Sequence, residues 1–296
     1  MKTIDRGVLF MFLSALFSAG NGAMAKMLAD DLSALEIVFF RNLFGAIFIF
    51  LTLKHTPTTS KGGKPFLLLY RGLFGFSALF LFFYTITSIP LGEAITLNKT
   101  SPLFVTILAF FLLGEKLSTK SIMALFLGFL GVAMITKPFG LSIGIAHFLG
   151  LLGGFLAAAA YTTIRKIKDI YDSRTIVLSF MGVGVIVPLL LFILAYFHQV
   201  PERLEFIIEP FIMPSSYKAW GLLFIIGITA TISQWLLTLA YSNSNAGIIG
   251  IASYSNIPFA IFFGTLLGDK MPNIFVFIGI ALIVLSGLMI TKKTKV

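Results

Sequence analysis

One charged side chain lies where a lysine is costly. Lys99 sits near the middle of an apolar stretch, Leu91 to Lys116, that is long enough to cross a bilayer. A charge at mid-bilayer costs about 2.5–3.5 kcal/mol on insertion scales, so it normally faces a cavity or a partner. Pro102 removes the amide that would bond the Asn98 carbonyl, which leaves an acceptor beside the ammonium. The stretch predicts a substrate-facing helix of a transport pathway; a structural or snorkelling lysine is the alternative.

Polar side chains at helical spacing accompany this lysine and recur in other apolar runs. On one continuous helix, one side would carry Glu93, Thr96, Lys99, Thr100, Leu103 and Thr106. Comparable stripes are Ser14, Ser18 and Asn21; Ser77, Tyr84 and Ser88; Thr231, Gln234, Thr238 and Tyr241; and Gly250, Ser253 and Asn256. A single serine or threonine more often bonds its own helix. The prediction of a polar cavity therefore depends on stripes in many runs.

Two arginines also lie within apolar runs. Arg71 is close to the end of its run, where a long side chain can snorkel to the surface, so a structural role is favoured for it. Arg41 lies one to two turns inside its run. It could pair with Glu36 or Glu93, or it could draw an anion inward, and both alternatives stay open.

The residues needed for most enzyme chemistry are missing. None of the 12 acidic residues falls at mid-membrane, and the chain has no cysteine. No phosphate-binding loop, zinc-protease motif, serine-hydrolase motif or metal-ligand cluster occurs. From these absences we expect that the protein is not an enzyme and that it binds no metal or cofactor. Glu93, at the edge of its run, is the residue on which an intramembrane enzyme or a proton relay would have to depend.

Composition places the whole chain in a membrane. The 296 residues are 58% hydrophobic and only 11% charged, whereas a soluble domain is about 25% charged. Ten apolar runs of spanning character follow one another: Gly7–Met27, Glu36–Leu53, Leu67–Ser88, Gly92–Leu113, Ser121–Ile135, Ile143–Ile164, Thr175–Tyr196, Ala219–Tyr241, Ala246–Leu267 and Ile274–Ile290. The fifth and tenth are almost bare of polar groups. They are expected to stand outside a cavity that the other runs line.

Positive charge predicts the orientation. With a cytoplasmic N-terminus, fourteen of the 22 lysines and arginines fall in cytoplasmic segments and five in outer ones. Both termini are therefore expected in the cytoplasm. The net charge of +10 arises from these short loops, so it does not predict a nucleic-acid partner.

The chain contains an internal repeat. Leu113-Gly114-Glu115-Lys116 returns 154 residues later as Leu267-Gly268-Asp269-Lys270, in each case after a proline-containing run. Five spans per copy is an odd number, so the copies must insert with opposite orientations. The sequence therefore predicts an all-α integral membrane protein with ten transmembrane helices in two inverted five-helix repeats, residues 1–138 and 139–296. Inverted repeats are a transporter architecture that binds substrate between the halves.

The chain resembles the EamA-like members of the drug/metabolite transporter superfamily. The resemblance is carried by Asn21 and Lys26, Glu36-Ile-Val-Phe-Phe-Arg41, Arg71-Gly72, Pro102-Leu-Phe-Val, Leu113-Gly114-Glu115 and Gly128-Phe-Leu-Gly131. It implies alternating access, metabolite transport across the bacterial inner membrane and no cofactor. The Glu36/Arg41 and Arg71-Gly72 patterns look like the branch that contains S-adenosylmethionine carriers. In the second half Asp269 replaces the family's glutamate, and Asn256 lies where the first half has its proline.

The expected function is secondary transport of a small amino-acid-like metabolite, zwitterionic or anionic, by a monomer or homodimer in the lipid bilayer. The expected substrate-binding residues are Lys99, Asn21, Arg41, Tyr84, Thr96, Thr100, Gln234, Tyr241, Ser253, Tyr254 and Asn256. Lys99 would hold the anionic group, with Arg41 assisting. The alternative is a membrane scaffold or lipid-binding protein without turnover.

Overall fold

The computed structural model describes residues 6–56, 60, 62–113, 119–136, 144–197, 208, 210–244, 249 and 252–291. Within these ranges all regular structure is helical. The helices are α1 (Arg6–Met27), α2 (Ala34–His55), α3 (Pro65–Ser88), α4 (Leu91–Asn98), α5 (Ser101–Leu113), α6 (Thr119–Thr136), α7 (Ile145–Ile167), α8 (Ser173–Phe197), α9 (Tyr217–Asn243), α11 (Asn256–Leu266) and α12 (Ile274–Thr291). Gly250 and the first copy of the repeated motif beyond Leu113 lie outside the described residues.

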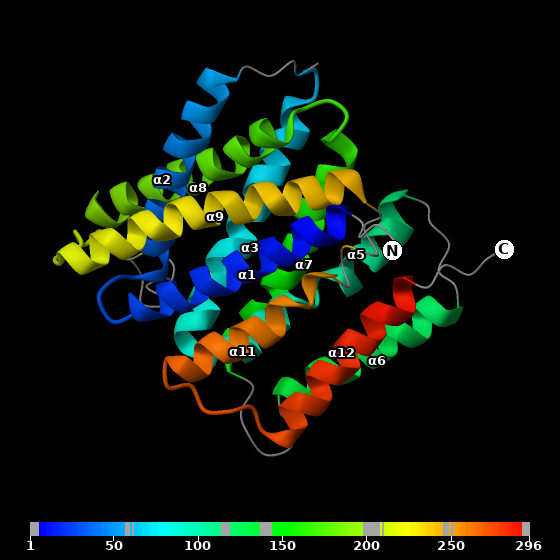
Figure 1. Ribbon diagram of the computed structural model, residues 1–296. Coiled ribbons are helices and arrows are strands. Elements are labelled where there is room, and N and C mark those ends of the chain that lie inside the picture. The colour runs from blue at the N-terminus through cyan, green and yellow to red at the C-terminus, as the bar shows by residue number, and fades with distance from the viewer. Residues whose placement is uncertain are drawn as a thin grey trace.

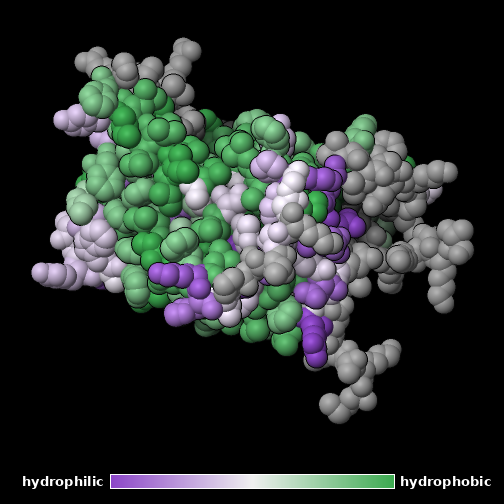
Figure 2. All heavy atoms as spheres, turned by 90° about the horizontal axis from the view of Figure 1, so that it is seen from above, coloured by the Kyte–Doolittle hydropathy of each residue, from purple (hydrophilic) through white to green (hydrophobic). Residues whose placement is uncertain are grey.

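The long helices have the dimensions and the surface of membrane spans. Within the described residues, α1, α2, α3, α7, α8 and α9 are each long and apolar enough to cross a bilayer. Their outward side chains are large and apolar, among them Phe50, Phe66 and Leu190. Figure 2 shows such side chains covering much of the face in view. A surface of this kind suits lipid, so the chain is a multi-pass membrane protein.

Local sequence signals set where helices begin. The Ser33 side chain accepts the Glu36 amide, and the Glu36 carboxylate accepts the Ser33 amide at 2.8 Å, which forms a capping box at the start of α2. Pro65 opens α3, where its fixed φ suits the first turn. The Ser216 hydroxyl accepts the Ala219 amide and caps α9.

The fourth span is broken, so the expectation of one continuous helix from Gly92 to Leu113 was wrong. Helix α4 ends at Asn98, a turn follows at Lys99 and Thr100, and α5 begins at Ser101. The physical reason is Pro102, which cannot donate a hydrogen bond to the preceding turn. The second half has a similar break, because a turn at Tyr254 and Ser255 precedes α11. The polar residues around Lys99 therefore do not share a single helix face.

Helices of the first part of the chain (α1 to α6) interleave with helices of the second part (α7 to α12). Helix α1 packs on α9 and α11, and in the reciprocal arrangement α7 packs on α3 and α5. Helix α2 packs on α8 and α9, and α8 also packs on α3. Figure 1 shows α1, α3, α7 and α9 crossing in the middle of the molecule. Residues far apart in sequence thus meet at its centre.

Helices α6 and α12 form a separate pair beside this bundle (Figure 1). They approach closely because Gly131 lies against the carbonyl of Gly279, where a Cβ would come within 2.6 Å of that oxygen. The Ser286 hydroxyl donates to the Ala124 carbonyl across the pair at 2.5 Å. Of the described residues that line the central cavity, none comes from α6 or α12. This arrangement agrees with the prediction made from their apolar sequences.

Candidate functional site

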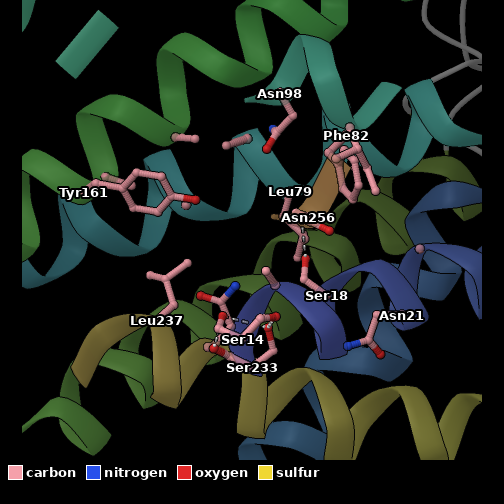
Figure 3. Close-up of a pocket in the computed structure, with 18 of the residues that line it drawn as sticks. Ser14, Ser18, Asn21, Leu79, Phe82, Asn98, Tyr161, Ser233, Leu237 and Asn256 are labelled. Carbon is pink, nitrogen blue, oxygen red and sulfur yellow. Dashed lines mark hydrogen bonds between the residues drawn. The ribbon is translucent and has the colours of Figure 1, made fainter. Parts of the chain in front are cut away.

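A cavity of about 80 Å³ lies where the central helices cross. A site needs roughly 10–15 Å³ to hold one water, so this cavity has room for several. Its polar and charged lining residues are Ser14, Ser18, Asn21, Arg41, Arg71, Asn98, Lys99, Tyr161, Ser233, Gln234 and Asn256. Figure 3 shows Ser18, Asn98, Tyr161 and Asn256 directed toward the space between the helices. The lining comes from both parts of the chain.

The wall between α1 and α9 is held by reciprocal hydrogen bonds. The Ser14 hydroxyl donates to the Ser233 carbonyl at 2.8 Å, and the Ser233 hydroxyl donates to the Ser14 carbonyl at 2.9 Å (Figure 3). About two turns after Ser14 on α1, the Asn21 side chain accepts a hydrogen bond from the Thr229 hydroxyl at 2.9 Å. The wall is therefore a fixed polar surface that joins helices distant in sequence.

Asn256, at the start of α11, links a second helix to this wall. Its amide nitrogen lies 3.4 Å from the Ser18 hydroxyl, and its amide oxygen is buried without a partner. Because a buried carbonyl normally accepts a hydrogen bond, this oxygen is an unsatisfied acceptor on a residue of the cavity wall.

Arg71 is buried in the cavity, so the interpretation of this residue as a snorkelling side chain was wrong. Only 1% of its surface is exposed. Its guanidinium donates to the Gln234 side chain over 3.5 Å and lies 4.8 Å from the ring centroid of Phe180. Gly75, one turn later on α3, makes the room: a Cβ there would come within 2.1 Å of the Arg71 Nη1 atom. The missing Cβ lets the guanidinium fold back along its own helix.

Arg41 projects from α2 into the same region and is 3% exposed. It donates to the neighbouring Asn42 side chain at 3.1 Å and lies 5.9 Å from the ring centroids of Phe83 and Phe180. The pairing with Glu36 considered above does not form. Glu36 accepts the amides of Ser33 and Ile212 instead. Among the described residues Arg41 has no ion-pair partner, and its Nε atom has no hydrogen bond.

Lys99 lies at the break between α4 and α5 and lines the cavity with 8% of its surface exposed. Its backbone amide bonds the Ile95 carbonyl and so ends α4. The preceding residue, Asn98, also lines the cavity. The broken span thus places a cation and an amide at the cavity wall from two adjacent residues.

The electrostatic character of the cavity is strongly positive. Arg41, Arg71 and Lys99 all line it, and no Asp or Glu is found among its described lining residues. Buried charges are normally paired or meet a ligand, because their loss of hydration is expensive. The arrangement is therefore suited to binding a negatively charged group, with hydrogen bonds from the neutral side chains around it.

Five of the eleven predicted binding residues line this cavity: Asn21, Arg41, Lys99, Gln234 and Asn256. The other six are absent from its lining: Tyr84, Thr96, Thr100, Tyr241, Ser253 and Tyr254. Thr96 and Thr100 donate to carbonyls of their own segment, at Gly92 and Leu97. Tyr241 stacks on Tyr161 with centroids 5.1 Å apart, while Tyr254 is buried in the core. A binding role for any of the eleven stays a prediction.

Sequence reasoning passed over Asn98, Tyr161 and Ser233 and undervalued Arg71, although all four line the cavity. Tyr161 follows four consecutive alanines, Ala157–Ala160, and two of these also line the cavity. A run of small residues ending in a tyrosine was the available signal. For Asn98 the signal was its position beside Lys99.

The sequence matches a known transporter family over nearly its whole length. The model of the EamA-like transporter family matches residues 5–137 and again residues 144–292. The pseudopaline exporter of Pseudomonas aeruginosa is 31% identical, over 100% of this chain and 99% of its own. An uncharacterized transporter of Helicobacter pylori is also 31% identical, over 98% of this chain and 95% of its own length.

Two further comparisons are narrower. The S-adenosylmethionine uptake transporter of Rickettsia felis is 33% identical, but over only 38% of this chain and 39% of its own length. A solved crystal structure has a TM-score of 0.67 with 16% identity, covering 98% of this chain and 97% of that one. The latter likeness establishes the fold alone. The two family matches and the full-length relatives confirm the resemblance drawn from the sequence motifs: this chain belongs to the EamA-like transporter family.

Proposed function

We propose that the chain is a secondary transporter that carries a small organic metabolite, amino-acid-like and zwitterionic or anionic, by alternating access. The observation that carries this proposal is the central cavity, where helices from both parts of the chain meet around three buried cations. Substrates of such carriers bind near mid-membrane at discontinuous helices. Here the breaks before α5 and before α11 lie at this cavity, since Lys99 and Asn256 line it.

The roles of the lining residues follow from their chemistry. Lys99 would hold an anionic group of the substrate as a point charge, and Arg41 would add directed N–H donors. Gln234, Asn21 and Asn256 would contribute amide hydrogen bonds around it. The hydroxyls of Ser14 and Ser233 are already used between helices, so they would shape the wall.

Two inverted five-helix halves are the arrangement that we propose for this transport. The family model matches the chain twice, at residues 5–137 and 144–292, and the contacts of α1 with α9 and α11 mirror those of α7 with α3 and α5. Both observations support the proposal. Together with the positive charge of the inner loops, they favour a bacterial inner-membrane protein with both termini in the cytoplasm.

Counterflow of labelled metabolites in proteoliposomes tests the proposal. Purified protein is reconstituted with an excess of unlabelled compound inside, and uptake of the labelled compound is followed. The panel contains amino acids, di- and tricarboxylates, S-adenosylmethionine and pseudopaline, the last two taken from the names of the relatives. Substrate-dependent uptake is the expected result. Absence of flux for the whole panel would favour a non-transporting scaffold or lipid-binding protein, and product formation dependent on Glu93 would favour an intramembrane enzyme.

A further inference from the structure

The cavity carries more positive charge than one carboxylate can neutralise. We propose that its substrate is a small, elongated molecule with at least two carboxylates and a net negative charge. This inference rests on the proposed transport function and narrows its substrate class. It is carried by Arg41, Arg71 and Lys99, which line one cavity and are 3%, 1% and 8% exposed.

None of the three cations is neutralised within the described part of the protein. The described ion pairs are Lys26 with Asp269 and Arg174 with Asp172, and neither involves the cavity. Among the described residues, Arg41 and Arg71 donate only to neutral amide oxygens, those of Asn42 and Gln234. Their partners therefore satisfy part of the donor capacity and none of the charge.

Each of the two arginines has a side-chain donor that the described part of the protein leaves unsatisfied. Each has a buried Nε atom without a hydrogen-bond partner. Their guanidinium carbons lie 5.9 and 4.8 Å from the centroid of the Phe180 ring, so both groups are held near one aromatic side chain. A guanidinium can bind a carboxylate through two parallel hydrogen bonds. Two such groups call for two carboxylates, and the Lys99 ammonium can donate hydrogen bonds to a third.

The residues that line the cavity are spread along two helices. Its lining on α3 begins at Arg71 and ends at Phe83, and its lining on α1 begins at Met11 and ends at Gly22. At 1.5 Å per residue, the lining residues span about 18 Å along α3 and about 16.5 Å along α1. An extended chain with separated carboxylates can reach several cations along such walls. A compact single carboxylate would leave most of the charge unpaired.

The same charge opposes cationic substrates. S-adenosylmethionine carries a fixed sulfonium charge, which three buried cations would repel. The cavity therefore favours a polycarboxylate over this compound, although one partial relative carries its name.

A graded series of probes tests the inference by equilibrium binding to the purified protein at pH 7 and constant ionic strength. The probes are butyrate, glutarate and tricarballylate, with one, two and three carboxylates, and S-adenosylmethionine. We expect the dissociation constant to fall about tenfold for each added carboxylate. We expect no binding of S-adenosylmethionine. Equal affinity across the series, or preference for S-adenosylmethionine, would overturn the inference.

Variants assign the effect to the cavity. Arg41→Gln and Arg71→Gln should each weaken tricarballylate binding about tenfold and leave butyrate binding nearly unchanged. Lys218→Gln is the matched control, because Lys218 is an exposed lysine outside the cavity. If Lys218→Gln weakens tricarballylate binding as much as the arginine variants do, the effect is non-specific screening and the inference fails.

A second measurement does not require a ligand. If the cations are uncompensated, Arg41→Met and Arg71→Met should melt at a higher temperature than the natural chain without ligand. Lower melting would show that the arginines stabilise the fold, and it would overturn the inference.

Counterflow separates this inference from the transport proposal. Graded polycarboxylate binding without flux would retain the substrate class and reject transport. Flux of a zwitterion or of S-adenosylmethionine, without graded binding, would retain transport and reject the substrate class.

Discussion

The ammonium of Lys26 lies 2.5 Å from one carboxylate oxygen of Asp269, and the other oxygen of Asp269 accepts the backbone amide of Leu91 at 2.9 Å. Lys26 is in the last turn of α1, Leu91 begins α4, and Asp269 follows α11. One carboxylate thus ties three segments together, and two of them belong to the first part of the chain and one to the second. This is the position at which Asp269 replaces the glutamate of the first copy.

Asp269→Asn should loosen this junction. The ion pair is partly exposed, so its loss should lower the free energy of unfolding by only about 1 kcal/mol or less. The main effect should be on conformation, because the tie between α1 and α11 would be weakened. The chain has no cysteine, so a single cysteine at Ser18 in the cavity can report access. A membrane-impermeant maleimide added outside should label it several-fold faster in the variant.

Asp172→Asn is the control for this experiment, since it removes the other described ion pair, which is local to residues 172 and 174. It should leave the labelling rate unchanged. Equal labelling of Asp269→Asn and the natural chain would show that the junction does not limit access to the cavity.

Lys99→Ala should abolish transport and leave the fold intact. The side chain lines the cavity and makes no hydrogen bond to the described part of the protein, so its removal takes away a binding charge and leaves the described hydrogen bonds in place. Counterflow activity and thermal melting in detergent are measured together. Melting should stay at or above that of the natural chain. Loss of transport together with a clear loss of melting temperature would make Lys99 a structural residue.

Gln234→Glu should stabilise the protein while weakening anion binding. The side-chain oxygen of Gln234 lies 3.5 Å from the Arg71 guanidinium, so a carboxylate at this position would pair with the buried charge. We expect a higher melting temperature and a tricarballylate affinity reduced by about tenfold. Gln234→Leu separates the two effects, because it removes the acceptor without adding charge. A Gln234→Glu variant that binds tricarballylate normally would contradict neutralisation of Arg71.

Gly154→Ala should destabilise the fold where α7 crosses the broken span. A Cβ at Gly154 would come within 2.6 Å of the Thr100 hydroxyl and 3.1 Å of the Leu97 carbonyl. Overpacking of this kind costs roughly 1–3 kcal/mol. The melting temperature should therefore fall. Adding Thr100→Ala should restore part of the lost melting temperature, since the two positions share one contact.

Gly182→Ala is the matched control for overpacking. It lies in helix α8, and nothing comes within 4 Å of a Cβ built there. It should be neutral or slightly stabilising because alanine favours the helix. A fall in melting equal to that of Gly154→Ala would show that the close approach of α7 to α4 is unimportant.

The features that depend on local composition were readable from the chain alone. A bilayer demands about 20 apolar residues in each span, so runs such as Gly7–Met27 and Thr175–Tyr196 predicted the long helices α1 and α8 directly. Lys99 was recognisable for the same reason, since a lysine at that depth requires a cavity or a partner. The bare fifth run likewise predicted that α6 would take no part in the cavity.

The rotation of each helix about its axis and its packing against other helices could not be predicted from the sequence. Periodicity states which residues share a face, but packing against α8 and α9 decided that Arg71 meets Phe180 and Gln234 and does not reach the surface. Pro102 indicated a break in the helix near this position. The tertiary structure decided that α4 ends at Asn98 and that Asn98 and Lys99 line the cavity. Apolar length is a property of each segment by itself. The gathering of three cations in one cavity depends on contacts between segments far apart in the chain, and these form only when the whole bundle packs.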